Sequence, residues 1–118
     1  MPNVKHNYYN FVVTVDQDRF GISRDELYHA LKQYNIFTRR YFYPLCSQFQ
    51  CYKNYPSSSA KNLPVAEKIS NSILTLPLYG SLEQEDIHKI SDVIASYAKK
   101  YTIDFNVQSA YFSHQNSM

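Results

Sequence analysis

The sequence predicts an α+β domain, a two-layer sandwich in which about three helices cover a small sheet of three or four strands. Short runs rich in β-branched and aromatic residues, such as Phe11 to Val15, are typical of strands. Segments with apolar residues at helical spacing follow them, for example after the Ser23-Arg24-Asp25-Glu26 sequence. Strands alternating with helices in one short chain favour helices packed on a sheet. The 118 residues suffice for a single domain, which we expect to span 1–118.

The first half of the chain predicts a strand, a helix and a second strand. Residues 8–15 form the first strand, and 16–21 form a polar turn. Ser23 and Glu26 have the spacing of a capping box, in which each side chain bonds the other residue's backbone amide, so a helix begins here. Asn35 suits a left-handed helix end. The second strand is expected over 36–43, where Pro44 ends it.

The second half predicts a long loop followed by two helices and one or two strands. The loop covers 47–62, and a helix begins near Pro64, because proline is favoured in a first turn. Residues 74–79 form a third strand, which Pro77 assigns to a sheet edge. A third helix spans 81–101. The buried sides of the two helices are expected at Ala66, Ile69 and Ile73, and at Ile87, Ile90, Ile94, Tyr97 and Tyr101.

The C-terminal residues carry a weaker signal. Residues 103–107 alternate like one more strand. We expect 102–118 to form an extension that is partly flexible, with its last residues frayed.

Residues 38–45, Thr-Arg-Arg-Tyr-Phe-Tyr-Pro-Leu, are the most informative segment for function. In an extended strand, Arg39, Tyr41 and Tyr43 share one face, while Arg40 and Phe42 share the other. A face that presents guanidinium and phenol groups together suits an anionic ligand that contains a ring. An ordinary half-buried strand with solvated arginines is the alternative.

Composition excludes several classes of function. A net charge of +2 provides no broad basic field for nucleic acid, and no run of apolar residues is long enough for a membrane span. Two glycines are too few for a dinucleotide fingerprint or a phosphate loop. Cys46 and Cys51 are read as free thiols, which favours a cytoplasmic protein. No catalytic residues and no metal ligands are predicted, because no nucleophile, carboxylate pair or histidine–cysteine set has usable spacing.

Four segments, in order and in register, resemble one family. They are Ser23 to Leu27, Thr38 to Leu45, Leu63 to Ile69 and Leu74 to Tyr79. Together they resemble the C-terminal small domain of the DegT/DnrJ/EryC1/StrS sugar-nucleotide aminotransferases, which are pyridoxal-phosphate (PLP) enzymes of the aspartate aminotransferase fold. The aromatic run is similar to the branch that aminates dTDP-3-keto-6-deoxyhexoses. The resemblance assigns 8–101 to this domain.

The resemblance implies a division of labour between two domains. The large domain carries the Schiff-base lysine and the cofactor site, so this chain alone is expected to bind no cofactor and to be inactive. The small domain covers the dTDP-sugar at a dimer-interface active site, which implies Arg39, Tyr41, Phe42 and Tyr43 as substrate-binding residues. Cys46 stands where many members have a histidine. A homodimer or a partner chain is implied.

A stand-alone ligand-binding or nucleic-acid-binding α+β module is the alternative function. Aromatic and basic residues on a strand could stack the bases of a single-stranded nucleic acid. The low net charge argues against this, because basic residues do not flank the strand in numbers. A structural role is the third possibility, since an excised domain exposes a tyrosine-rich face that favours self-association.

Overall fold

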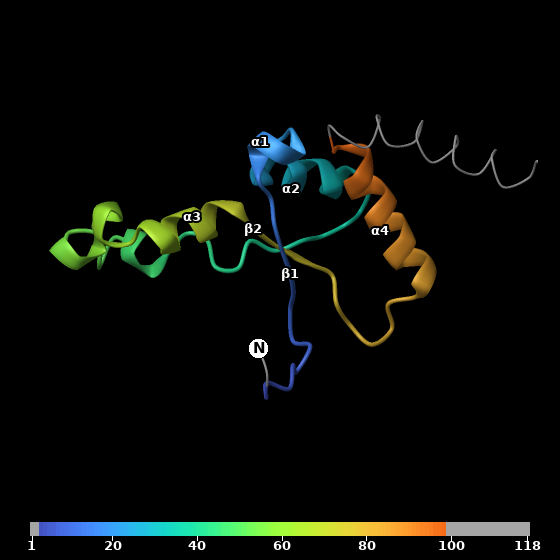
Figure 1. Cartoon of the computed structure of the whole chain (residues 1–118), viewed down its shortest axis with the longest axis horizontal. Helices are drawn as coiled ribbons and strands as arrows, with labels where there is room; N and C mark the ends of the chain where they lie inside the picture. Colours follow the sequence, from blue (N-terminus) through green and yellow to red (C-terminus); the bar gives the residue numbers. More distant parts are fainter. Residues whose placement is uncertain (1–2, 99–118) are drawn as a thin grey trace, which may run out of the picture.

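The computed structural model describes residues 3–98, which form a small α+β structure with two strands and four α-helices (Figure 1). The elements are, in chain order, β1 Phe11–Thr14, α1 Gln17–Phe20, α2 Arg24–Gln33, α3 Pro64–Ser72, β2 Ile73–Leu76 and α4 Gln84–Ser96. Three 3-10 turns, η1 Cys46–Gln48, η2 Pro56–Ser58 and η3 Ala60–Asn62, lie between α2 and α3. The α+β class is confirmed, whereas the two-layer sandwich stays a prediction.

Helix α2 begins where the sequence places it. The Ser23 hydroxyl accepts a hydrogen bond from the Glu26 amide at 3.2 Å, and the Glu26 carboxylate accepts one from the Ser23 amide at 2.7 Å. The predicted capping box is therefore present. Asn35, just beyond the helix, has a φ of 58°, so the predicted left-handed end is also confirmed.

The sheet is smaller than predicted within residues 3–98. β1 and β2 pair antiparallel, with Phe11 opposite Leu76 and Thr14 opposite Ile73. The predicted strand over 36–43 is wrong, because it contributes a single antiparallel bridge between Arg39 and Thr75. β2 is an edge strand of this two-stranded sheet, as predicted, although Arg39 bridges to it at Thr75 on the side away from β1. Pro77 follows the strand rather than lying inside it.

Two further boundaries differ from the prediction. Residues 16–21, predicted as a polar turn, contain α1, because the Asp16 carboxylate accepts from the amides of Asp18 and Arg19 and caps a helical turn. Helix α4 starts at Gln84 rather than at residue 81, and it ends at Ser96. The predicted strand at 103–107, Tyr101 and the C-terminal extension lie outside the described residues.

The hydrophobic core lies where α2 and α4 meet β2. Leu31 and Leu74 are 0% exposed and Leu27 is 1% exposed. The other members of this cluster are Val15, Ile36 and Ile90. Ile90 is buried as predicted and Ile94 and Tyr97 are half-buried, but Ile87 is exposed, so the predicted apolar face of α4 is wider than the face that packs.

An arm, defined here as residues 45–72, extends from the sheet on the side opposite α4 (Figure 1). It contains the three 3-10 turns on its outgoing part and α3 on its return. The side-chain amide of Gln48 donates to the Glu67 carboxylate at 3.1 Å and so joins the outgoing and returning parts of the arm. Ile69, predicted to be buried, is 44% exposed, because α3 lies in the arm, away from the core. Ser70 is buried instead.

Replacing Ser23 with alanine is expected to lower the free energy of unfolding by about 1 kcal/mol, since an amide in the first turn of α2 loses its acceptor. Chemical denaturation followed by circular dichroism measures the change. The matched control is Ser81→Ala at an exposed turn position, which we expect to have little effect. Equal losses in the two variants would contradict a stabilising capping box.

No helix among residues 3–98 is both long enough and apolar enough to cross a membrane.

Candidate functional site

The candidate site is the segment from Arg39 to Tyr43, which leaves β2 and leads into the arm. The Arg39 amide donates to the Thr75 carbonyl at 2.9 Å, and the Thr75 amide returns a bond to the Arg39 carbonyl at 2.7 Å. Directly afterwards the chain turns, with the Tyr43 amide donating to the Arg40 carbonyl at 2.7 Å. Because of this turn, the alternation of faces predicted for an extended strand does not hold.

All four predicted site residues remain accessible to a ligand, Tyr43 at 40% exposure included. Arg39 is exposed, and Tyr41 and Phe42 are 40% and 76% exposed. The rings of Tyr41 and Phe42 are stacked, with centroids 5.1 Å apart and planes inclined by 21°. The turn therefore presents a pair of parallel rings next to a guanidinium-bearing residue, a surface that suits a planar or ring-containing anion.

Tyr43, the fourth predicted residue, contacts two arginines. Its ring centroid lies 4.8 Å from the guanidinium carbon of Arg24 and 5.2 Å from that of Arg40. Both distances are within the range of a cation–π interaction. The structure thus brings Tyr43 to residues of α2 and of its own turn, apart from the stacked pair of Tyr41 and Phe42.

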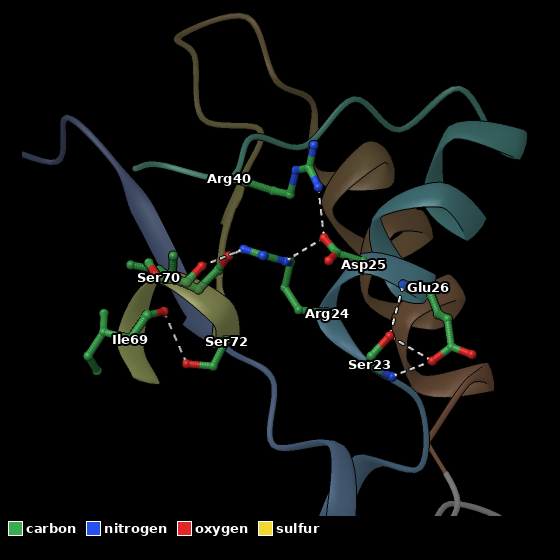
Figure 2. A network of polar contacts seen from close by, with 9 residues as sticks. Ser23, Arg24, Asp25, Glu26, Arg40, Ile69, Ser70 and Ser72 are labelled. Carbon is green, nitrogen blue, oxygen red and sulfur yellow. Dashed lines mark hydrogen bonds and ion pairs between the residues drawn. The ribbon is translucent and has the colours of Figure 1, made fainter. Parts of the chain in front are cut away.

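Asp25 links the two arginines (Figure 2). Its Oδ1 accepts from Arg24 Nε and from Arg40 Nη1, each at 2.8 Å. On the other side, Arg24 Nη1 donates to the carbonyls of Ser70 at 2.8 Å and Ile73 at 2.9 Å. The network connects the start of α2, the turn at 40–43 and the end of α3.

Arg24 is the functional candidate that the sequence analysis did not single out. It is 2% exposed, although an arginine is rarely buried without a partner. It is the first residue of α2, where the positive end of the helix dipole disfavours a cation. That mismatch was a signal in the sequence that its charge serves another element.

Tyr28 adds a cationic face next to this network. Lys32 Nζ lies 4.3 Å from its ring centroid, and the guanidinium carbon of Arg40 lies 4.5 Å from it. The Lys32 ammonium, with smaller contributions from Arg40 and Arg39, lowers the pKa of the Tyr28 phenol. Positive charge therefore accumulates along the side of α2 that faces the turn.

The carboxylates of α2 are held in their ionised forms. Partial burial raises the pKa of Asp25, but the hydrogen bonds and positive charges of Arg40 and Arg24 outweigh it and lower that pKa below its ordinary value. Hydrogen bonds from the Ser23 hydroxyl and amide lower the pKa of Glu26. Both groups are thus better stabilised as anions in the folded chain than in the unfolded chain.

Stability is expected to fall as the pH drops below about 4.5, because carboxylates with lowered pKa values contribute fully above their unfolded pKa and lose that contribution as they protonate. Urea midpoints measured from pH 7 to pH 3 follow the loss. The Asp25→Asn/Glu26→Gln double variant is the control, and its stability should change less over this range. A wild-type midpoint that rises on acidification would contradict the lowered pKa values.

Two hollows lie near the candidate site. One, of ≈ 450 Å³, opens on the arm directly after Pro44 and is lined by Cys46, Ser47, Tyr52, Tyr55, Ser57 and Ser58. Its lining of hydroxyl groups and phenol rings suits neutral polar ligands. The other, of ≈ 200 Å³, lies between the segment after α2 and the start of α4, with Phe37, Tyr79 and Lys89 among its lining residues. Its lining includes none of the four predicted site residues.

The residues described do not fit a covalently held PLP cofactor. A Schiff-base lysine needs a shielded site with a lowered pKa. Every lysine between residues 3 and 98 is exposed, and these are Lys5, Lys32, Lys53, Lys61, Lys68 and Lys89. Lys89 is exposed although it helps to line the smaller hollow. All other aspartates of the same range are exposed, and the Asp25 side chain is itself 49% exposed, with two arginines at its Oδ1. No shielded aspartate is thus left to pair with a pyridine nitrogen in this part of the chain.

Other candidate chemistry is sparse in the described part of the chain. Residues 3–98 contain no group of three or more histidine, cysteine or acidic side chains that could hold a metal ion. Cys46 and Cys51 are both exposed and free. What the arrangement offers is a surface for recognition by exposed rings, hydroxyls and guanidinium groups.

Comparison with known proteins identifies the class. The DegT/DnrJ/EryC1/StrS aminotransferase family matches residues 1–95, so the chain belongs to this family. The resemblance inferred from the four sequence segments is therefore confirmed.

Two transaminases are similar to about three quarters of the chain. The dTDP-4-amino-4,6-dideoxy-D-glucose transaminase of Escherichia coli is 40% identical over 92 residues, which are 78% of this chain and 24% of that enzyme. The Shigella dysenteriae protein of the same name is 39% identical over 75% of this chain and 23% of its own length. The chain thus spans about a quarter of the length of these relatives.

A solved structure agrees with the fold. The chain is similar to the crystal structure of a DegT DnrJ EryC1 StrS aminotransferase from Brucella abortus, with a TM-score of 0.61 and 26% identity. The match covers 77% of this chain and 22% of that one. The two-stranded sheet with its helices is thus an arrangement that occurs within a larger aminotransferase.

Proposed function

We propose that this chain is the C-terminal small domain of a PLP-dependent sugar-nucleotide aminotransferase, and that it covers the substrate without transaminating alone. One observation carries the proposal. The family matches residues 1–95, most of the chain, yet the chain spans only about a quarter of the relatives' length. The exposed positions of the lysines between residues 3 and 98 support the second half, because none of these is placed to hold the cofactor. The single domain over 1–118 and a cytoplasmic location belong to the same proposal.

A dTDP-keto-6-deoxyhexose is the substrate class that we propose. The name of the E. coli and Shigella relatives puts the amino group on carbon 4 of a 4,6-dideoxyglucose. A transaminase places an amino group where a keto group was, so the corresponding substrate is a dTDP-4-keto-6-deoxyglucose. The resemblance of the aromatic run implied a 3-keto sugar, and these relatives favour carbon 4.

The turn at 39–43 supplies the contacts in this proposal. The exposed Arg39 guanidinium pairs with the diphosphate, since planar guanidinium groups match phosphate oxygens bidentately. The stacked rings of Tyr41 and Phe42 pack against a ring of the sugar nucleotide. Tyr43 supports the turn through Arg24 and Arg40, and its hydroxyl completes the proposed contact surface. The assembled enzyme is a dimer in which the missing domain contributes the cofactor.

A domain graft tests the proposal. Residues 1–95 replace the aligned segment of the E. coli relative, and transamination of dTDP-4-keto-6-deoxyglucose is measured with an amino-acid donor. We expect the graft to be active, and both the chain alone and the relative without its segment to be inactive. Activity of the isolated chain would overturn the claim that it needs the missing domain.

The graft also has an outcome that counts against the substrate-covering role. Cofactor absorbance and circular dichroism report whether the graft is folded and loaded with PLP. A folded, loaded graft that does not bind the dTDP-sugar would contradict the role proposed for residues 39–43. A graft active only on the 3-keto sugar would correct the proposed carbon while supporting the rest.

A further inference from the structure

The arm is joined to the core through two short segments, and one side chain contacts both. The chain enters the arm after Tyr43 and leaves it at Ser70 to Ile73, where α3 ends and β2 begins. The Arg24 guanidinium lies over the Tyr43 ring, 4.8 Å from its centroid. Arg24 also donates to the carbonyl of Ser70, as Figure 2 shows, and to that of Ile73. Arg24 belongs to α2, so it connects both ends of the arm to the core.

Where the chain leaves the arm, Arg24 provides hydrogen-bond donors for carbonyls at the C-terminal end of α3. The last carbonyls of a helix have no partner within the helix, and a cation near that end also interacts favourably with the helix dipole. Ser70 lies in the last turn of α3, and Ile73 is its C-cap. Arg24 Nη1 donates to both carbonyls from a position that is 2% exposed, where unpaired groups are costly.

The contacts at the entering end form a layered arrangement. The Tyr43 ring contacts the guanidinium groups of both Arg24 and Arg40, and Asp25 Oδ1 joins these two groups. Asp25 therefore fixes the orientation of the Arg24 plane through Nε, while Nη1 remains directed at the α3 carbonyls. A lysine has no such planar fork, so a single ammonium at this position would leave contacts at both ends of the arm unmade.

We propose that Arg24 is a positioning residue that sets the place of the arm and of the turn at 40–43 relative to the core. Through Tyr43 it orients the turn that carries the stacked rings of Tyr41 and Phe42, and through α3 it orients the return of the arm. Arg24 itself has no role in contacting substrate. The effect on substrate depends on the proposed function, whereas the anchoring of the arm is a property of the chain alone.

Hydrogen–deuterium exchange of the intact chain tests the anchoring, with Arg24→Lys as the variant. We expect exchange to become about tenfold faster or more both at the amides of Gln48 and Phe49 and at the end of α3, because charge-assisted bonds are lost. Amides in the middle of α2 and in α4 should keep their protection. Arg19→Lys, on exposed α1, is the matched control and should change neither region.

Three results would overturn the proposal. They are unchanged exchange in both arm regions, faster exchange at one end alone, and an equal rise throughout residues 3–98, which indicates general destabilisation. If Arg24→Lys does not fold, Tyr43→Leu decides, because it removes the stacked ring alone. Tyr43→Leu should speed exchange at Gln48 and Phe49 and leave the end of α3 protected. Unchanged exchange at Gln48 and Phe49 would overturn the proposal.

Activity of the grafted enzyme separates this inference from the proposed function. If the graft is active, Arg24→Lys should raise KM for the dTDP-sugar severalfold more than it lowers kcat, since the covering segment is misplaced before chemistry begins. If the graft is inactive with any substrate, the proposed function fails, while the exchange experiment still decides the anchoring.

Discussion

Replacing Leu31 with alanine is expected to destabilise the chain by about 2–5 kcal/mol, since Leu31 is 0% exposed and lies in the cluster shared by α2, α4 and β2. The loss combines the lost transfer free energy of the methyl and methylene groups with the cavity that they leave. Domains of this size have unfolding free energies of about 5–15 kcal/mol, so the variant should be partly unfolded at moderate temperature. Urea denaturation followed by circular dichroism measures the change.

A matched substitution separates burial from side-chain chemistry. Leu78→Ala removes the same atoms from a residue that is 43% exposed, and it should cost less than about 1 kcal/mol. Equal losses at Leu31 and Leu78 would contradict the position of the core. Leu31→Met should recover most of the stability, because methionine fills a similar volume.

Replacing Arg39 with alanine in the grafted enzyme is expected to lower kcat/KM for the dTDP-sugar by about 10–100-fold. Hydrogen bonds to charged groups contribute about 1.5–3 kcal/mol, and about 1.4 kcal/mol corresponds to a factor of ten. The fold should be unaffected, because Arg39 pairs with Thr75 through its backbone and its side chain is exposed. Initial-rate kinetics with varied dTDP-sugar measure the effect.

Two controls make this result specific to the diphosphate contact. Arg19→Ala removes an exposed arginine from α1 and should leave kcat/KM unchanged. Arg39→Lys keeps the charge but loses the planar fork, so it should recover part of the activity. Unchanged kinetics in Arg39→Ala would contradict the assignment of Arg39 to the substrate.

Local signals predicted the helix starts and stops well. The Ser23–Glu26 capping box, the left-handed Asn35 and the first-turn Pro64 each satisfy a backbone need within a few residues, so neighbouring sequence is enough to recognise them. The centre of the first strand was predicted from its β-branched and aromatic residues, although β1 is shorter than the predicted 8–15.

Long-range contacts overrode the prediction at residues 36–43. β-branched and aromatic composition favours a strand there, but the Arg40 and Tyr43 side chains are engaged by Asp25, Tyr28 and Arg24 of α2. These contacts stabilise a turn after Arg39. Pattern analysis counts propensities within a window, and it has no means of recording a partner that lies on another element.

The arrangement of the candidate site was only partly predictable from the sequence, again because its contacts come from another element. The four residues named from sequence lie together on one turn, but Tyr43 contacts arginines while Tyr41 and Phe42 stack on each other. Arg24 was missed because its partners, the carbonyls of Ser70 and Ile73, become its neighbours when the chain folds. A cation at the first position of α2 was the signal that a local analysis could have used.

The central claim is that this chain provides a covering domain and leaves the cofactor to the rest of the enzyme. Borohydride reduction in the presence of equimolar PLP, followed by peptide mass spectrometry, tests it on the isolated chain and on the grafted enzyme. We expect the graft to carry a stoichiometric adduct on a lysine from the E. coli relative, and the isolated chain to show traces spread over its exposed lysines. A stoichiometric adduct on a single lysine of the isolated chain, abolished when that lysine is replaced by alanine, would contradict the account.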